Sequence, residues 1–453
     1  MKEHQMSKRI VIIGAHAAGV DAASAARKTD RTAEITLITK QKQAGYSPCA
    51  IPFVLGRHIS SFDKLVVFPQ SYFRMMKLNL MLETTATNID VNNKTVEIQD
   101  KTGKQETLQY DSLILATGAS PFIPPIKGRE KQGVYVLRTI EDGKKIDQAI
   151  DNGAKTAVVM GAGLIGLETA VAFQERGLRT TVVELLPQIL PVMLDADMAK
   201  SVQEMLEQKG INIMVSKGVE EFLGTDKVTG IIAGGEQINA DLIIAAFGVR
   251  ANTELAKEAG IAIGEARGIK TNVRMETNVK DVYAAGDCAE CIHMITQCPA
   301  LPQLGTTAVR QAKVAGANAA GGYAIFPGVL GSAVTKLFDT EIGVTGLTEF
   351  FAEKAGLKTV TGTITSKTRP EYYPGGTSIK IKLVVEKEIE RIVGAQIIGG
   401  EQVTQRINAL SFAIQKQMTV RELAKADTAY APPLNETWEP LILAAEIVLR
   451  KLR

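Results

Sequence analysis

The sequence predicts an α/β fold with two parallel-sheet units, and three observations carry this prediction. Residues 8–14 read KRIVIIG, a short β-rich run that ends in glycine, and a small-residue helical stretch and the β-rich run EITLIT follow it. Residues 155–161, KTAVVMG, begin the same succession again. Two more strand-like runs, within 112–121 and 281–290, each end in a turn of small residues. Because strands alternate with helices, and because the pattern occurs twice, we expect two Rossmann-like dinucleotide-binding domains.

The second copy carries a complete glycine pattern. Gly161, Gly163 and Gly166 are spaced as G-x-G-x-x-G between the predicted strand and helix. In such a pattern the first glycine makes a tight turn, the second lets the backbone approach a pyrophosphate, and the third lets the helix pack on the strand. Glu184, at the end of the next strand, can bind a ribose 2′-hydroxyl and would repel a 2′-phosphate. This favours NADH over NADPH, although Arg179 is close in sequence and weakens the preference.

The first copy is degenerate. Gly14 and Gly19 keep their spacing, but His16 occupies the place of the second glycine. Thr39 and Lys40 stand where an acidic ribose ligand is expected. Taken alone, this copy is only moderate evidence for a bound nucleotide.

The small-residue turns suggest further contacts with a nucleotide. Asp287 follows Gly286 at a predicted strand end, where its carboxylate could bind a ribityl hydroxyl. The alternative is that Asp287 only caps the helix that follows. The neighbouring Cys288 and Cys291, with Cys298 and His293, have irregular spacing for a zinc site, so we favour packing or an accessory thiol and predict no metal.

Composition limits the remaining classes. A net charge of +3 with scattered basic residues gives little support for nucleic-acid binding. The first residues contain no apolar stretch ahead of a cleavage site, and no run is as long as a membrane span. Four cysteines in 453 residues are too few for a disulfide framework, which favours a cytoplasmic protein without a membrane partner.

Taken in chain order, these motifs resemble the flavin-dependent pyridine nucleotide–disulfide oxidoreductases. The order is a degenerate glycine loop, a lone cysteine in GYSPCAIPF, the ATG turn, a complete glycine loop with an acidic end, and the AAGD turn. The single-cysteine branch fits best, which includes coenzyme A–disulfide reductases, NAD(P)H sulfur reductases, NADH oxidases and NADH peroxidases. The segments PEYYPGG (370–376) and AYAPPLNETWEP (429–440) resemble its dimerisation domain.

The resemblance implies a homodimer with three domains per chain. We expect an FAD-binding domain in residues 1–119 and 249–325, an NAD(P)H-binding domain in residues 120–248, and an α+β dimerisation domain in residues 326–453. It assigns to FAD the residues Gly14, His16, Ala17, Gly19, Thr39, Thr117, Gly118, Gly286 and Asp287. It assigns to NADH or NADPH the residues Gly161, Gly163, Gly166, Glu168 and Glu184, with Glu168 near the nicotinamide and the flavin.

The resemblance also implies a role for Cys49. Relatives with two cysteines carry the second one five residues on, where this chain has Val54, and their C-terminal catalytic histidine is absent because the last histidine is His293. Electrons would therefore pass from NAD(P)H through FAD to Cys49 alone. Ala17 stands where the oxidases and peroxidases carry a histidine, which favours a disulfide, coenzyme A-disulfide or polysulfide substrate. The alternative function is an NADH oxidase or peroxidase that acts through a Cys49 sulfenic acid. The non-catalytic alternative is that Cys49 is a buried structural thiol.

Substrate contacts are suggested by the same resemblance. Tyr430 and one of Tyr372 and Tyr373, with Tyr373 favoured, would reach the cysteine site of the partner subunit and protonate a leaving thiolate. Gly45 and Pro48 replace the serine and asparagine of the coenzyme A site, so coenzyme A as bound substrate or adduct remains open beside other small disulfides. Three basic residues could hold its phosphates, or be solvated helix residues: Arg27, Lys28 and Lys77.

Overall fold

The computed structural model describes residues 7–453. Residues 1–6, on which part of the prediction about an N-terminal leader rests, lie outside the described residues. The chain divides into two compact units. Unit 1 contains the residues up to Ile51, Ile59–Ser120 and Val249–Val329, and unit 2 contains Pro52–His58, Pro121–Gly248 and Leu330–Arg453. This division does not separate residues 120–248 from 326–453, so the predicted domain boundaries stay a prediction.

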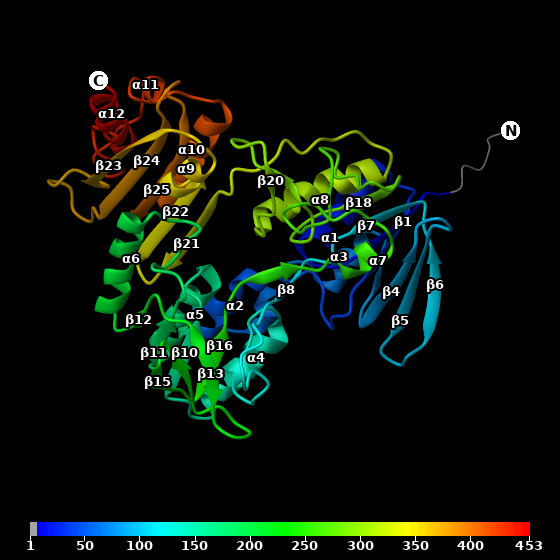
Figure 1. The fold of residues 1–453 in the computed structure, drawn as a ribbon. Helices are drawn as coiled ribbons and strands as arrows, with labels where there is room; N and C mark the ends of the chain where they lie inside the picture. The colour runs from blue at the N-terminus through cyan, green and yellow to red at the C-terminus, as the bar shows by residue number, and fades with distance from the viewer. Residues whose placement is uncertain (1–6) are drawn as a thin grey trace. The chain divides into compact units, whose positions relative to one another are not determined.

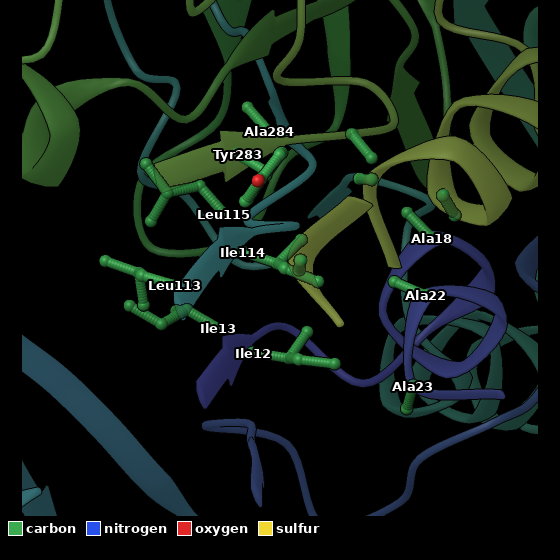
Figure 2. Close-up of a cluster of buried hydrophobic side chains, with 14 of the residues drawn as sticks. Ile12, Ile13, Ala18, Ala22, Ala23, Leu113, Ile114, Leu115, Tyr283 and Ala284 are labelled. Atoms are coloured by element: carbon green, nitrogen blue, oxygen red, sulfur yellow. The ribbon is translucent and has the colours of Figure 1, made fainter. Parts of the chain in front are cut away.

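Unit 1 is built on a five-stranded parallel sheet with the order β18-β7-β1-β2-β3 (Figure 1). Three of its strands, β1, β7 and β18, are nearly continuous buried runs, as expected for strands that are covered on both faces. Figure 2 shows side chains of these three strands packed together with alanines of the first helix. The strands and the two long helices of this unit are β1 (Arg9–Ile13), β2 (Glu34–Ile38), β3 (Leu78–Met81), β7 (Ser112–Leu115), β18 (Val282–Ala284), α1 (Ala17–Thr29) and α8 (Gly305–Ala319).

Small residues let α1 and α8 pack closely. A Cβ atom on Gly316 would lie 2.1 Å from the carbonyl oxygen of Ala22, so the two backbones nearly touch at this point. Ala18, Ala22 and Ala23 are buried on α1, and Figure 2 places them beside the sheet. The alanine-rich composition of α1 therefore lets this helix pack closely against α8 and the sheet.

Shorter elements complete unit 1. Three antiparallel strands form a separate sheet, β4 (Thr84–Asp90), β5 (Thr95–Asp100) and β6 (Gln105–Gln109). The others are η1 (Pro48–Ala50), η2 (Phe62–Leu65), α3 (Gln70–Met75), α7 (Glu254–Glu258), β19 (Cys291–Ile292) and β20 (Pro299–Ala300). Elements at the chain crossings between the units are α2 (Ile51–Leu55), β8 (Ala119–Pro121) and β17 (Val249–Ala251).

Unit 2 contains a second parallel sheet with the order β12-β11-β10-β16-β9. Its elements are β9 (Val134–Tyr135), β10 (Thr156–Met160), β11 (Arg179–Val183), β12 (Asn212–Met214), β16 (Leu242–Ala245), α4 (Ile140–Asp151), α5 (Leu164–Glu175) and α6 (Ala196–Gln208). A three-stranded antiparallel sheet accompanies it, formed by β13 (Val219–Leu223), β14 (Gly230–Ala233) and β15 (Glu236–Asn239).

The C-terminal part of unit 2 is an antiparallel sheet with the order β21-β22-β25-β24-β23 (Figure 1). Its strands are β21 (Ala333–Leu337), β22 (Thr340–Gly346), β23 (Thr359–Lys367), β24 (Ser378–Glu386) and β25 (Ile392–Gly399). Its helices are α9 (Glu349–Lys354), α10 (Val403–Gln415), α11 (Val420–Leu423) and α12 (Pro440–Leu452), of which α10 packs on β22 and β25 and α12 on β23 and β24. The predicted α/β class is thereby confirmed. Within residues 7–453, no helix is both long and apolar enough to cross a membrane.

Candidate functional site

The glycine loop of unit 2 has the shape that its sequence predicts. Gly161 has a φ of +104°, and a Cβ atom there would lie 2.3 Å from the carbonyl oxygen of Ala246, directly after the neighbouring strand β16. A Cβ atom on Gly166 would lie 2.0 Å from the carbonyl oxygen of Gly161. Around Gly163, in contrast, a Cβ atom would meet nothing within 4 Å. The first and third glycines therefore allow close packing, and the second opens a space at the N-terminus of α5 that fits a pyrophosphate.

Glu184 lies at this loop, directly after β11. Its carboxylate is buried and accepts hydrogen bonds from the backbone N–H groups of Ala162, at 2.7 Å, and Leu186, at 2.8 Å. Each carboxylate oxygen has a second lone pair, so Glu184 can still accept a hydrogen bond from a ribose hydroxyl. The residue is fixed in place before a nucleotide binds.

Arg179 does not lie near this carboxylate. It opens β11, whereas Glu184 follows the end of the same strand. At about 3.3 Å per residue, five positions separate the two Cα atoms by roughly 16 Å. Arg179 is therefore too far away to bind the 2′-phosphate of NADPH beside Glu184.

The loop of unit 1 repeats the packing of the first and third glycines. Gly14 has a φ of +117°, and its Cβ would lie 2.0 Å from the carbonyl oxygen of Ala116. A Cβ atom on Gly19 would lie 1.8 Å from the carbonyl oxygen of Gly14. The loop that looks degenerate in sequence thus keeps the tight turn and the close helix contact that a dinucleotide site requires. Ala17 is the first residue of α1, whose N-cap is His16.

His16 belongs to a hydrogen-bonded cluster that the sequence did not reveal. Its Nε2 lies 2.9 Å from Oε1 of Gln41, which also accepts a hydrogen bond of 2.8 Å from the hydroxyl of Tyr46. The rings of His16 and Tyr46 meet edge to face with centroids 4.5 Å apart. Thr39 is buried, and its hydroxyl accepts a 3.3 Å hydrogen bond from the N–H of Gln41. We call Gln41, His16 and Tyr46 the Gln41 cluster.

The ATG turn is hydrogen-bonded to Asn252, which lies where the chain returns from unit 2 to unit 1. The hydroxyl of Thr117 donates to the carbonyl oxygen of Asn252 at 2.7 Å, and the Asn252 amide donates to the carbonyl oxygen of Thr117 at 2.8 Å. The N–H of Asn252 also donates to the carbonyl oxygen of Gly118. These bonds fix the backbone of the turn that follows β7.

The AAGD turn follows β18, the strand next to β7. Gly286 has a φ of +86° and donates its N–H to the buried amide of Gln311 at 2.8 Å. The N-cap of α8 is Leu304, so Asp287 does not cap that helix. The helix-capping alternative for Asp287 is therefore wrong, and its place at the carboxyl end of the sheet suits a ligand-binding role.

Cys49 lies in the first turn of a helical segment, in η1, which leads into α2, and its thiol is exposed. The backbone before it is tied to the glycine loop, because the N–H of Gly45 donates to the carbonyl oxygen of Ala15 at 2.9 Å. Gly45 has a φ of +65°, and a Cβ atom there would lie 2.8 Å from Phe68, so this position needs glycine. Val54, in place of a second cysteine, is buried.

The other cysteines divide into buried and exposed thiols. Cys288 and Cys291 are buried in the core of unit 1, and Cys298 is exposed. Burial raises the pKa of Cys288, whose thiol faces the carbonyl oxygens of Leu115 and Ala285, and raises the pKa of Cys291 to about 12. Within residues 7–453 there is no group of three metal-binding side chains. Packing explains both buried thiols.

Glu168 has a partner from the C-terminal sheet. It lies on α5, and its Oε1 accepts a 2.6 Å hydrogen bond from the hydroxyl of Thr335 on β21. Burial raises the pKa of Glu168, and the hydrogen bond from Thr335 opposes that rise. No pattern in the sequence connects these two residues, which are far apart in the chain.

Of the two adjacent tyrosines, Tyr372 is hydrogen-bonded to Tyr430, and their hydroxyls lie 2.6 Å apart. This hydrogen bond raises the pKa of Tyr372. Which of Tyr372 and Tyr373 reaches a cysteine site of the partner subunit stays a prediction. The N–H of Tyr373 donates to the carbonyl oxygen of Pro370, which closes a turn at this tyrosine pair. Asn435 holds the segment of Tyr430 through hydrogen bonds to residues 429 and 431.

The three basic residues proposed for phosphate binding have different environments. The guanidinium of Arg27 donates to backbone carbonyl oxygens, among them those of Met76, Ala33 and Lys77. These bonds give Arg27 a structural role at the C-terminal end of α1. Arg27 and Lys77 line an open surface groove of about 580 Å³, whereas Lys28 is exposed outside its lining.

Two family models match the chain. Residues 8–318 match the model described as pyridine nucleotide-disulphide oxidoreductase, and residues 332–442 match its dimerisation domain. Together they span nearly all of the described residues.

Individual relatives align along almost the full length. An NADH oxidase of Methanocaldococcus jannaschii is 47% identical, and the alignment covers 98% of this chain and 99% of the relative. An NAD(P)H coenzyme A polysulfide/persulfide reductase of Pyrococcus horikoshii is 35% identical, with 98% and 99% covered. The solved structure of an NAD-dependent persulfide reductase from A. fulgidus superposes with a TM-score of 0.96 at 38% identity, covering 98% of this chain and 83% of that one.

Proposed function

This chain belongs to the pyridine nucleotide-disulphide oxidoreductase family, and we propose that Cys49 makes it a reductase of small sulfur compounds. It is an FAD-dependent oxidoreductase that takes electrons from NAD(P)H. One observation carries the proposal for Cys49. Its exposed thiol lies in a segment whose backbone is hydrogen-bonded to the glycine loop of unit 1, through Gly45 and Ala15.

The chemistry at Cys49 is thiol–disulfide exchange. The Cys49 thiolate attacks one sulfur of a disulfide, which forms a mixed disulfide and releases the other sulfur as a thiolate. Bound FAD would supply the two-electron relay from NAD(P)H. Two electrons break the sulfur–sulfur bond of the mixed disulfide and give two thiolates, one on Cys49 and one on the second product, which takes up a proton as it leaves. Because Val54 stands in place of a second cysteine, Cys49 cannot form an internal disulfide with that position.

We further propose that the enzyme works as a homodimer and that Tyr430 of the partner subunit, with its bonded Tyr372, protonates the leaving thiolate. Three large, exposed apolar side chains in the stretch that matches the dimerisation domain support a subunit interface there: Phe412, Leu434 and Trp438. The hydrogen bond between the two phenols orients both hydroxyls, which suits proton donation.

The substrate class follows from the cysteine segment and from the relatives. The P. horikoshii and A. fulgidus relatives are named persulfide reductases, which supports a persulfide, polysulfide or coenzyme A-linked disulfide as acceptor. The commitment of Arg27 to backbone carbonyls leaves Lys28 and Lys77 as the better candidates for coenzyme A phosphates. A thiol that cycles in this way requires a reducing compartment, so we propose the cytoplasm.

A second function is favoured by the M. jannaschii relative, which is named an NADH oxidase. In that reaction Cys49 would cycle through a sulfenic acid and reduce oxygen or peroxide. Ala17 begins α1 at the place where the oxidase and peroxidase pattern has a histidine, and the side chain of His16 contacts Gln41 and Tyr46 instead. This arrangement favours the sulfur reaction.

Anaerobic turnover of disulfide or polysulfide, compared with consumption of oxygen or peroxide, separates the two functions. We expect Cys49→Ser to lose disulfide reduction but to keep bleaching of the flavin by NADH. Cys298→Ser is the matched control, because Cys298 is the other exposed cysteine among residues 7–453. Sulfur turnover that survives in Cys49→Ser would refute the proposal.

We propose NADH as the preferred donor. The buried carboxylate of Glu184 would repel a 2′-phosphate, and Arg179 lies at the opposite end of its strand. Glu184→Ala should raise the KM for NADH and narrow the preference over NADPH. An unchanged ratio of kcat/KM for the two donors would contradict this assignment.

A further inference from the structure

The two glycine-loop units place corresponding residues at the end of their second strands. In each unit the first glycine donates its N–H to the last residue of the second strand, which is Ile38 in one unit and Val183 in the other. The residue after that strand donates its N–H to the last residue of the third strand. Thr39 and Glu184 are therefore structurally equivalent, although their side chains differ.

The exchange of glutamate for threonine keeps one hydrogen bond and loses another. Both side chains accept a hydrogen bond from the backbone N–H two residues on, which is Leu186 after Glu184 and Gln41 after Thr39. The second carboxylate oxygen of Glu184 also accepts from the glycine loop, at Ala162. Thr39 has no second oxygen and no negative charge. Unit 1 thus lacks the acceptor that binds a ribose hydroxyl in sites of this kind.

Gln41 offers a different group at this place. Its Oε1 lies 2.9 Å from His16 Nε2 and accepts a hydrogen bond from the Tyr46 hydroxyl, so both lone pairs of the oxygen are used. Since this oxygen only accepts, the Nε2 of His16 is the donor. The amide nitrogen of Gln41 has no hydrogen-bond partner within residues 7–453. Gln41 is therefore held by its oxygen and presents only N–H donors.

The cluster lies on the nucleotide side of the loop. His16 occupies the position of the second glycine, and at the equivalent Gly163 a Cβ atom would point into open space. At the equivalent position in unit 1, the side chain of His16 contacts Gln41, and the buried Tyr46 ring packs against the His16 ring from the Cys49 segment. The Gln41 amide is thereby fixed shortly after the end of the second strand, where a fold of this kind would hold the adenosine half of FAD.

We propose that Gln41 is a recognition residue for the adenosine half of FAD in this chain, and that it acts as a hydrogen-bond donor in place of the usual carboxylate acceptor. His16 and Tyr46 are positioning residues that fix the amide through its oxygen. The inference rests on FAD binding to unit 1. In this contact the protein side chain donates the hydrogen bond, whereas Glu184 in unit 2 accepts it.

The test measures FAD binding to the deflavinated protein by quenching of flavin fluorescence, with FMN as a second probe because it lacks the adenosine half. Gln41→Glu keeps the size of the side chain and an oxygen for His16 and Tyr46, but it removes the donors. We expect Gln41→Glu and Gln41→Ala to weaken FAD binding roughly threefold to tenfold, the worth of one hydrogen bond, and to leave FMN binding unchanged. Lys42→Ala, an exposed neighbour in the same loop, should bind both flavins like the wild type.

The outcomes are separable. Tighter FAD binding by Gln41→Glu would mean that an acceptor is preferred and would overturn the inference, as would unchanged binding by Gln41→Ala. Equal losses of FAD and FMN would also overturn it, because they would reflect a general disturbance of the loop. If Gln41→Ala does not fold, Tyr46→Phe, which removes one bond to the Gln41 oxygen, must weaken FAD selectively. Wild-type protein that binds no FAD would instead refute the proposed function.

Discussion

The replacement Thr335→Val tests whether the C-terminal sheet controls the charge of Glu168. Valine has the shape of threonine but cannot donate the 2.6 Å hydrogen bond to the Glu168 carboxylate. Because burial already raises the pKa of Glu168 and this bond opposes the rise, its loss should raise the pKa further. A hydrogen bond to a charged group contributes about 1.5–3 kcal/mol, so its loss should disfavour the charged carboxylate, relative to the protonated form, by about that amount.

The assay is stopped-flow reduction of the flavin by NADH as a function of pH. If Glu168 lies near the nicotinamide, the limb of the profile that reports its ionisation should move to higher pH in Thr335→Val. Thr335→Ser keeps the hydroxyl and should retain the wild-type profile. An unchanged limb in the valine variant, or an equal shift in both variants, would refute the reasoning.

The pH dependence of the melting temperature is a second, independent test of the pKa of Glu168. A carboxyl whose pKa is raised in the folded state binds its proton more tightly there than in the unfolded chain. Folding is therefore favoured as pH falls through the folded pKa of Glu168, and it is penalised above that value. The melting temperature of Thr335→Val should fall below that of the wild type at pH 7, and the two should converge in acid.

Three further predictions concern packing and burial. Lys382→Met should cost about 3–5 kcal/mol in urea unfolding, since it leaves the buried Asp195, 3.1 Å from Lys382 Nζ, without its counter-charge; a loss below 1 kcal/mol would contradict this. Gly166→Ala should lower both the melting temperature and NADH affinity, because its Cβ would lie 2.0 Å from a backbone oxygen, whereas Gly163→Ala should lower only the affinity. Cys291, whose pKa burial raises to about 12, should resist alkylation at pH 8 until the protein unfolds, and rapid labelling of the folded protein in mass spectrometry would disprove that burial.

Local pattern was sufficient for the backbone of both nucleotide folds. The strand before Gly14, the strand before Gly161 and the helices after them lie where the apolar runs and glycines predict. Glycine spacing determines turn geometry through steric contacts within a few residues. The absence of a second cysteine five residues after Cys49 can be seen directly in the sequence. These features depend on neighbours in sequence, so the sequence alone determined them.

Side-chain partners were decided by the tertiary structure. The hydrogen bond between Tyr372 and Tyr430 joins residues that are 58 positions apart in the chain. The hydrogen bond between Glu168 and Thr335 joins a helix to a strand of the C-terminal sheet, 167 positions further along. Gln41 shows no motif, and it gains a role only because the fold brings His16 and Tyr46 to its oxygen. Hydrogen bonds between distant segments depend on distances of a few ångströms that no spacing in the sequence encodes, which is why only the folded chain could reveal them.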